Sequence, residues 1–284
     1  MGRMTMNQKP IVIFAAMLLL FACRGRNGGT QADETPADSL AAQDTATADI
    51  QEQLMGDMPV PKAADELFDD FIFNFAANQR LQLQRIKFPL LVRHDSTMER
   101  IERKKWKMEY FFMRQGYYTL LFDDVHQMER MKDTSVVHAV VEKIYLEKGR
   151  VKQYVFDCIG GQWMMTAIEE LPLGKSHNAS FLDFYRRFAS DADFQAKSLN
   201  RQVKFVGPDP DDDFSQMEGV ITAETWGAFA PELPSKMIYN IVYGEPQTGS
   251  NQKIFLLRGI ANGLELTMNF KYVGGRWLLT RLAT

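Results

Sequence analysis

The sequence is poor in cysteine and in excess charge, and each shortage excludes a class of protein. Two cysteines in 284 residues cannot form the framework of a disulfide-stabilised fold. A formal net charge of −3 differs from the strong basicity of dedicated nucleic-acid-binding proteins, so we expect no nucleic-acid partner. The composition, 45% hydrophobic and 24% charged, is typical of a globular chain rather than a fibrous or disordered one.

Recognisable catalytic signatures are also missing. The sequence contains no phosphate-binding glycine loop, no nucleophile elbow and no dinucleotide fingerprint. It has four histidines, and none lies in a Glu-x-x-His or Cys-x-x-Cys set. We therefore expect no cofactor.

The N-terminus carries a targeting signal. Arg3 and Lys9 precede an apolar run over residues 11–22, which has the length of a signal-peptide core and is too short to span a membrane comfortably. Residues 20–23, Leu-Phe-Ala-Cys, resemble a bacterial lipobox, in which the peptide is cut before the cysteine and the cysteine receives lipid. An ordinary cleaved signal or a short anchor is the alternative.

The lipobox resemblance implies an address. Residues 1–22 would be removed, and lipidated Cys23 would anchor the protein to a membrane of the bacterial cell envelope. Arg24 and Arg26 differ from acidic surface-export signals, which favours the periplasmic side. Cys158 would then have no partner within the chain and would remain a free thiol.

Residues 23–62 have the composition of a tether. The segment is small, polar and acidic and lacks the apolar periodicity needed to offset the entropy of ordering. Asp38-Ser39-Leu40 and Asp44-Thr45-Ala46 look like the O-glycosylation motif of some Gram-negative lipoproteins, which makes Ser39 and Thr45 candidate acceptors.

An internal duplication organises the rest of the chain. Residues recur in order at shifts between 113 and 121, which predicts two similar domains at residues 63–173 and 174–284. The matched sets are Phe68, Phe71, Phe75 and Ala76 with Phe181, Phe184, Phe188 and Ala189; 86–88 with 203–205; Ile101 and Trp106 with Ile221 and Trp226; 118–122 with 239–243; and 160–166 with 274–280.

Each repeat has the pattern of an α+β domain. An amphipathic helix comes first, followed by a middle region with a short tryptophan-bearing helix and then by an antiparallel meander. Alternation places Leu264, Leu266, Met268, Phe270 and Tyr272 on the inner sheet face, and the register adds Tyr154, Phe156 and Cys158. The predicted strands are 117–122, 136–146, 151–159 and 163–169, and then 238–243, 254–261, 264–273 and 277–282.

This plan resembles the cone of nuclear-transport-factor-2-like (NTF2-like) proteins, a long N-terminal helix packed on a curved antiparallel sheet. The doubled pattern with paired Gly-Gly-x-Trp hairpins at Gly160 and Gly274, behind a lipobox, resembles the tandem lipoproteins of the domain of unknown function 4348. The resemblance covers residues 63–284 and implies architecture and location, since that family has no established activity. The wider superfamily contains both enzymes and binding modules, so fold alone does not assign function.

The candidate catalytic residues are Asp123, Asp124 and His126, with Tyr118 on the preceding strand. A carboxylate and an imidazole at a strand end could serve as general acid and base. The corresponding segment of the second repeat has no histidine, and a polar loop is the alternative interpretation.

Metal-binding candidates are limited to an acidic cluster. Asp209, Asp211, Asp212 and Asp213 could supply oxygen ligands to calcium, although their spacing differs from an EF-hand loop, and a solvated turn is favoured. His138 and Glu142 share a strand face but would need further ligands.

A basic stripe is predicted if residues 100–107 are helical. Arg100, Arg103, Lys104 and Lys107 would then lie on one side and could meet lipid headgroups or anionic glycans, although a solvated face is favoured. Trp106 is repeated as Trp226, which indicates packing rather than ligand binding.

The leading hypothesis is a noncatalytic, membrane-anchored envelope lipoprotein that binds a ligand or a protein. One alternative is a cone-pocket enzyme with an acid–base site in the first domain. The other is a small-molecule or lipid carrier, which requires an open apolar pocket.

Overall fold

The computed structural model describes residues 65–209, 211–246 and 249–284, apart from the side chains of residues 213 and 214. Cys23, Ser39 and Thr45, with the signal and tether segments, lie outside the described residues. No helix in the described part of the chain is long and apolar enough to cross a membrane.

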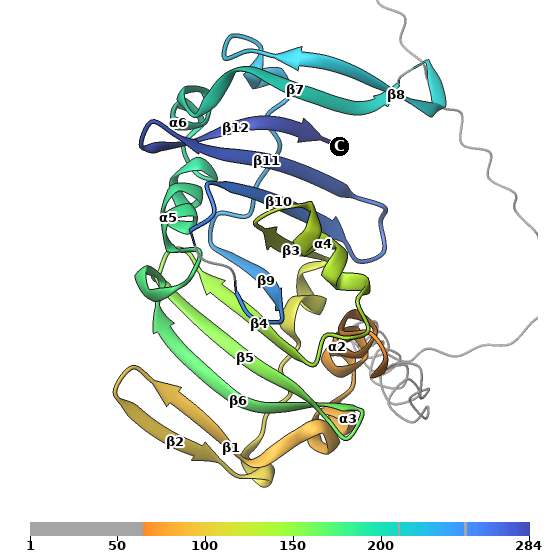
Figure 1. Cartoon of the computed structure of the whole chain (residues 1–284), viewed down its shortest axis with the longest axis vertical. Coiled ribbons are helices and arrows are strands. Elements are labelled where there is room, and N and C mark those ends of the chain that lie inside the picture. The colour runs from red at the N-terminus through yellow and green to blue at the C-terminus, as the bar shows by residue number, and fades with distance from the viewer. Residues whose placement is uncertain (1–64, 210, 247–248) are drawn as a thin grey trace, which may run out of the picture. The chain divides into compact units, whose positions relative to one another are not determined.

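The described chain is an α+β fold with twelve strands in two six-stranded sheets (Figure 1). The first repeat contains α2 (Phe68–Ala77), α3 (Gln79–Arg85), β1 (Ile86–His94), β2 (Thr97–Ile101), β3 (Tyr117–Phe122), α4 (Val125–Glu129), β4 (His138–Tyr145), β5 (Arg150–Ile159) and β6 (Gln162–Pro172). The second contains α5 (Ala179–Phe188), α6 (Ala192–Lys197), β7 (Leu199–Asp209), β8 (Asp212–Ile221), β9 (Met237–Tyr243), β10 (Gln252–Gly259), β11 (Glu265–Val273) and β12 (Arg276–Ala283). Short 3-10 turns are η2 (Arg103–Lys105), η3 (Phe111–Gln115), η4 (Arg130–Lys132), η5 (Leu173–Lys175) and η6 (Trp226–Ala228).

The helices form where aromatic residues recur at helical spacing. In α2 the buried face includes Phe68, Phe71 and Phe75, and in α5 it includes Phe181 and Phe188. The second helix of each pair starts at a side-chain cap, Asn78 for α3 and Asp191 for α6. The aromatic spacing thus predicted both long helices.

The sheets are mixed, which corrects the expectation of an antiparallel meander. Strands β4, β5 and β6 pair antiparallel, as do β10, β11 and β12, but β1 pairs parallel to β6 and β7 pairs parallel to β12. The hairpins β1–β2 and β7–β8 lie in the region for which only a short helix was expected. Those strands carry mixed polar and apolar residues, with most of β2 exposed, so their pattern is weak.

The two repeats exchange one strand each. The sheet orders are β2-β1-β6-β5-β4-β9 and β3-β10-β11-β12-β7-β8, so β9 completes the first repeat's sheet and β3 completes the second's. Figure 1 shows β3 and β9 side by side between β10 and β4. The predicted division between residues 173 and 174 therefore does not separate the two sheets, because backbone pairing crosses it in both directions.

The strand pairing corrects two of the sequence matches. Phe122 pairs with Ile254, and Val242 pairs with Val140, the residue equivalent to Ile254, so β3 and β9 correspond at a shift of 120 rather than 121. Likewise Ile86 corresponds to Leu199, because they pair with the equivalent residues Met165 and Leu279. The first match was wrong by one residue, which exchanges the two faces of a strand, and the second by four residues, because similar short motifs occur at neighbouring positions.

Aromatic side chains fill the interior of both repeats. Phe71 and Phe75 contact Phe156, and Phe184 and Phe188 contact its equivalent, Phe270. Phe71, Phe75, Phe156, Phe188 and Phe270 are essentially inaccessible to solvent. Aromatic rings therefore fill the space between each long helix and its sheet.

The predicted inner face of β11 is buried at its centre and open at its ends. Leu266, Met268 and Phe270 are buried, whereas Leu264 is 48% and Tyr272 is 42% exposed. Cys158, half-buried and unpaired, packs beside the first aromatic core. The alternation therefore identified the correct face but not the extent of its cover.

The repeated tryptophans are packing residues, as their duplication suggested. The Trp106 indole donates a hydrogen bond to Gln82 at 3.0 Å, and Trp226 donates to Gln195 at 3.1 Å. The predicted basic stripe is wrong, because Arg100 lies in β2 and the helical turn covers only Arg103–Lys105.

We predict that the two repeats unfold in a single transition, because each sheet depends on a strand of the other. Phe156→Ala and Phe270→Ala remove equivalent, fully buried rings and should each lower the free energy of unfolding by about 3–5 kcal/mol. Calorimetry or urea denaturation should show both substitutions shifting one common transition.

The control is Val220→Ala, an exposed change on β8 with an expected effect within about 0.5 kcal/mol. Two separate transitions, each shifted by only one of the phenylalanine variants, would contradict the interlocked arrangement.

Candidate functional site

The three candidate catalytic residues at the end of β3 have separate surroundings. Asp123 is buried at 3% exposure, Asp124 caps α4 by accepting a hydrogen bond from the Gln127 amide at 2.9 Å, and the His126 side chain is 89% exposed. His126 lies 3.6 Å from Glu129 on its own helix. The predicted acid–base group therefore does not converge on one cavity, which corrects that interpretation.

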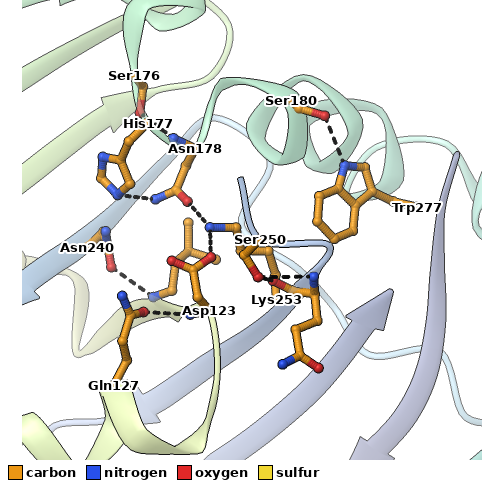
Figure 2. A network of polar contacts seen from close by, with 12 residues as sticks. Asp123, Gln127, Ser176, His177, Asn178, Ser180, Asn240, Ser250, Lys253 and Trp277 are labelled. Atoms are coloured by element: carbon orange, nitrogen blue, oxygen red, sulfur yellow. Dashed lines mark hydrogen bonds and ion pairs between the residues drawn. The ribbon is translucent and has the colours of Figure 1, made fainter. Parts of the chain in front are cut away.

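Asp123 instead forms an ion pair with Lys253, and both side chains are buried. The Lys253 ammonium also donates to the side-chain carbonyl of Asn178, so Asp123, Lys253 and Asn178 form a cluster (Figure 2). A buried charge is costly when it has no partner. The ion pair and the hydrogen bond to the amide lower that cost for both Asp123 and Lys253.

The Asn178 contact also sets the orientation of His177. Because the Asn178 carbonyl accepts from Lys253, its amide nitrogen faces His177 Nε2 at 2.8 Å and donates to it. The His177 proton then resides on Nδ1, which lies 3.9 Å from the Glu142 carboxylate. Lys253 therefore fixes the orientation of the Asn178 amide and, through it, the position of the proton on the His177 ring.

Glu142 links this cluster to the strand exchange. Its carboxylate accepts from Gln153 at 2.9 Å and from the Asn240 amide at 2.8 Å. Asn240, on β9, accepts in turn from the backbone amide of Leu121 on β3 at 2.8 Å. We call Asp123, Glu142, His177, Asn178, Asn240 and Lys253 the interrepeat network.

The interrepeat network has room for water but not for a substrate. The cavity beside Asp123, Gln127, His177 and Asn178 measures about 20 Å³, the size of one water molecule. Its polar atoms bond mainly to one another across the repeats, so the arrangement stabilises the fold and leaves no room for an organic reactant.

A second polar cluster closes the sheet end of the first repeat. The Glu109 carboxylate accepts from Tyr154 at 2.5 Å and lies 3.2 Å from the Lys143 ammonium. Burial raises the pKa of Glu109, but the Tyr154 hydrogen bond and the Lys143 charge outweigh burial and bring that pKa below its ordinary value. Burial and the Glu109 charge raise the pKa of Tyr154, so Tyr154 stays a neutral donor.

An open apolar groove lies at the corresponding end of the second repeat. It measures about 510 Å³ and lies between β3, β10, the start of β11 and the loop before β9. We call it the leucine groove; its lining residues are Tyr117, Pro231, Glu232, Leu233, Pro234, Leu257, Leu264, Glu265, Leu266 and Thr284. Its volume is within the range of roughly 300–1,000 Å³ typical of small-molecule sites.

Comparison with known proteins identifies the family. The family model described as "Domain of unknown function (DUF4348)" matches residues 47–284. The chain belongs to the DUF4348 family. A crystal structure of an NTF2-like protein from Bacteroides fragilis NCTC 9343 is 40% identical, with a TM-score of 0.71 over 79% of this chain and 98% of that chain. No curated protein matches.

These matches confirm the predicted resemblance to DUF4348 and to NTF2-like proteins. The DUF4348 description names no activity, so a function for this chain has to be argued from its own cavities and side chains.

The acidic residues considered for calcium lie in the β7–β8 hairpin of this DUF4348 protein. Asp209 accepts from the Asp211 amide at 2.9 Å and from Ser215 at 3.2 Å, as in a solvated hairpin turn, and the Asp213 side chain lies outside the description. Among the described residues no group of three or more His, Cys, Asp or Glu side chains could hold a metal ion. His138 instead bonds to Asp157 at 2.7 Å, away from Glu142.

The sequence reasoning missed Lys253, Asn178 and Asn240. A lysine directly before the apolar run at 254–257 was the available signal, because a charge on a buried strand requires a partner. Its partner could not be found from the sequence, since Asp123 lies 130 residues away and on an exchanged strand.

We predict that Lys253→Met destabilises this DUF4348 fold by about 3–5 kcal/mol, because Asp123 would be left buried without its cation. The double variant Asp123→Asn with Lys253→Met should lose clearly less stability than the sum of the two single variants. Urea denaturation of all four proteins gives the coupling energy.

Two neighbouring changes serve as controls. Asp124→Ala removes a helix cap and should cost about 1 kcal/mol, while His126→Ala should have an effect within about 0.5 kcal/mol. Equal losses for His126→Ala and Lys253→Met would show that the network does not stabilise the fold.

Proposed function

We propose that this protein is a noncatalytic binding module of the bacterial cell envelope, anchored through lipid on Cys23. The observation that carries the binding role is the contrast between the two sites: the leucine groove is open, whereas the interrepeat network encloses only about 20 Å³. The lipobox-like residues 20–23 and the polar tether 23–62 support the anchor.

The proposed arrangement is two NTF2-like units in tandem, residues 63–173 and 174–284, each with a long N-terminal helix packed on a curved sheet. The contacts of Phe68 with Phe156 and Trp163, and of Phe181 with Phe270 and Trp277, support it. The exchanged strands then hold the two units together at the end of the tether.

The carrier alternative is favoured over the enzyme alternative by one observation. A carrier requires an open apolar cavity of several hundred Å³, and the leucine groove is such a cavity. An enzyme acting through Asp123, Asp124 and His126 would need them around one substrate, but Asp123 is buried with Lys253 and His126 faces solvent. The noncatalytic proposal would be contradicted if the purified protein turned over a substrate and Asp124→Ala abolished that turnover.

The proposed location is a membrane of the envelope, with the folded part on the periplasmic side. The partners are then the membrane, through the N-terminal lipid, and an envelope ligand or protein. Ser39 and Thr45 in the tether would be accessible to O-glycosylation.

We predict that Cys23→Ala abolishes acylation and releases the protein from the lipoprotein pathway, because the acceptor thiol is gone. Metabolic labelling with an alkyne fatty acid, followed by membrane fractionation in a bacterial host, measures both effects. Cys158→Ala is the matched control, since Cys158 is half-buried in the folded part, and it should label like the unaltered protein. Unchanged labelling of Cys23→Ala would refute the anchor.

A further inference from the structure

The leucine groove lies at positions where the two repeats differ in the charge of their side chains. The strand register matches three of the four groove leucines to basic residues of the first repeat: Leu257 corresponds to Lys143, Leu264 to Arg150 and Leu266 to Lys152. One repeat thus carries three cations where the other carries three leucines.

The basic residues of the first repeat are engaged by acidic neighbours. Lys143 lies 3.2 Å from Glu109, Arg150 lies 3.2 Å from Asp95, and Lys152 lies 3.6 Å from Glu170. These pairs close that end of the first repeat. The leucines of the second repeat make no such pairs, and the space above them remains open to solvent at about 510 Å³.

Carboxylates supply the charge of the leucine groove. Glu232 and Glu265 are both exposed, and the lining contains no lysine, arginine or histidine. The guanidinium of Arg258 lies 2.9 Å from one carboxylate oxygen of Glu265. The Tyr117 hydroxyl adds a neutral polar group, and burial raises the pKa of Tyr117, which keeps it protonated.

An apolar floor with an acidic rim selects for a particular kind of ligand. The apolar part of the ligand would gain from contact with Leu257, Leu264 and Leu266. Its polar end would meet carboxylate oxygens, which accept hydrogen bonds and attract positive charge but repel anions.

We propose that the leucine groove binds a small amphiphile with an apolar chain and a cationic headgroup, the headgroup lying beside Glu232. This inference rests on the proposed binding function and specifies its ligand class. The complementarity of charge disfavours fatty-acid anions, although these have the same apolar chain.

The test uses residues 47–284, the part of the chain that the family model matches. The match to the crystallised relative covers 98% of that chain and 79% of this one, which supports expressing the folded part without residues 1–46. Isothermal titration calorimetry with monomeric dodecylammonium, dodecanol and dodecanoate compares three headgroups on one chain length.

We expect one dodecylammonium per chain, with dodecanol and dodecanoate binding successively more weakly by about threefold at each step. Glu232→Lys, an exposed change, should reverse the preference between ammonium and carboxylate. Leu264→Arg places the residue of the first repeat in the groove and should weaken dodecylammonium binding about tenfold.

The matched controls are Glu224→Lys and Val220→Arg, both at exposed positions outside the groove lining, and they should bind like the unaltered protein. Equal binding of all three amphiphiles, tighter binding of dodecanoate, or a preference unaffected by Glu232→Lys would overturn the inference. Absence of binding would overturn it too, while the anchor and the noncatalytic role would still be decided by the Cys23 and turnover experiments.

Discussion

The exchange of β3 and β9 joins the two sheets, because each repeat supplies the last strand of the other repeat's sheet. Each of these strands ends its sheet, and an unpaired sheet edge exposes backbone groups that require partners. The two edges satisfy each other through side chains: Thr119 accepts from the Tyr239 amide at 3.1 Å, and Asn240 accepts from the Leu121 amide. The interrepeat network extends from this junction, so its charges stabilise the contact between the repeats.

The sequence predicted the elements better than their connections. The spacing of Phe68, Phe71 and Phe75 and the alternation in β11 identified the long helix and the buried sheet face, because both depend on local periodicity. The strand exchange could not be predicted, since it depends on contacts more than 100 residues apart. Asp123 was singled out as a catalytic candidate for the same reason: without Lys253 in view, a carboxylate at a strand end looks available.

The correspondence between the strands of the two repeats places a closed site and an open one at equivalent positions. The two repeats keep equivalent aromatic cores, with Phe156 and Phe270 at matching positions, so stability restricts change there. The ends of the sheets are free to differ. Lys143 forms an ion pair in the first repeat, whereas Leu257 contributes to a groove in the second. A binding role for the second repeat is therefore compatible with a structural role for the first.

Ligand binding at the leucine groove is the proposal that joins this fold to a function. Hydrogen–deuterium exchange of residues 47–284, with and without dodecylammonium, locates the bound ligand on the fold. We expect slower exchange in residues 231–234 and 257–266, which line or border the groove, and no change elsewhere. Slower exchange in residues 143–152, or around Asp123 and Lys253, would contradict it.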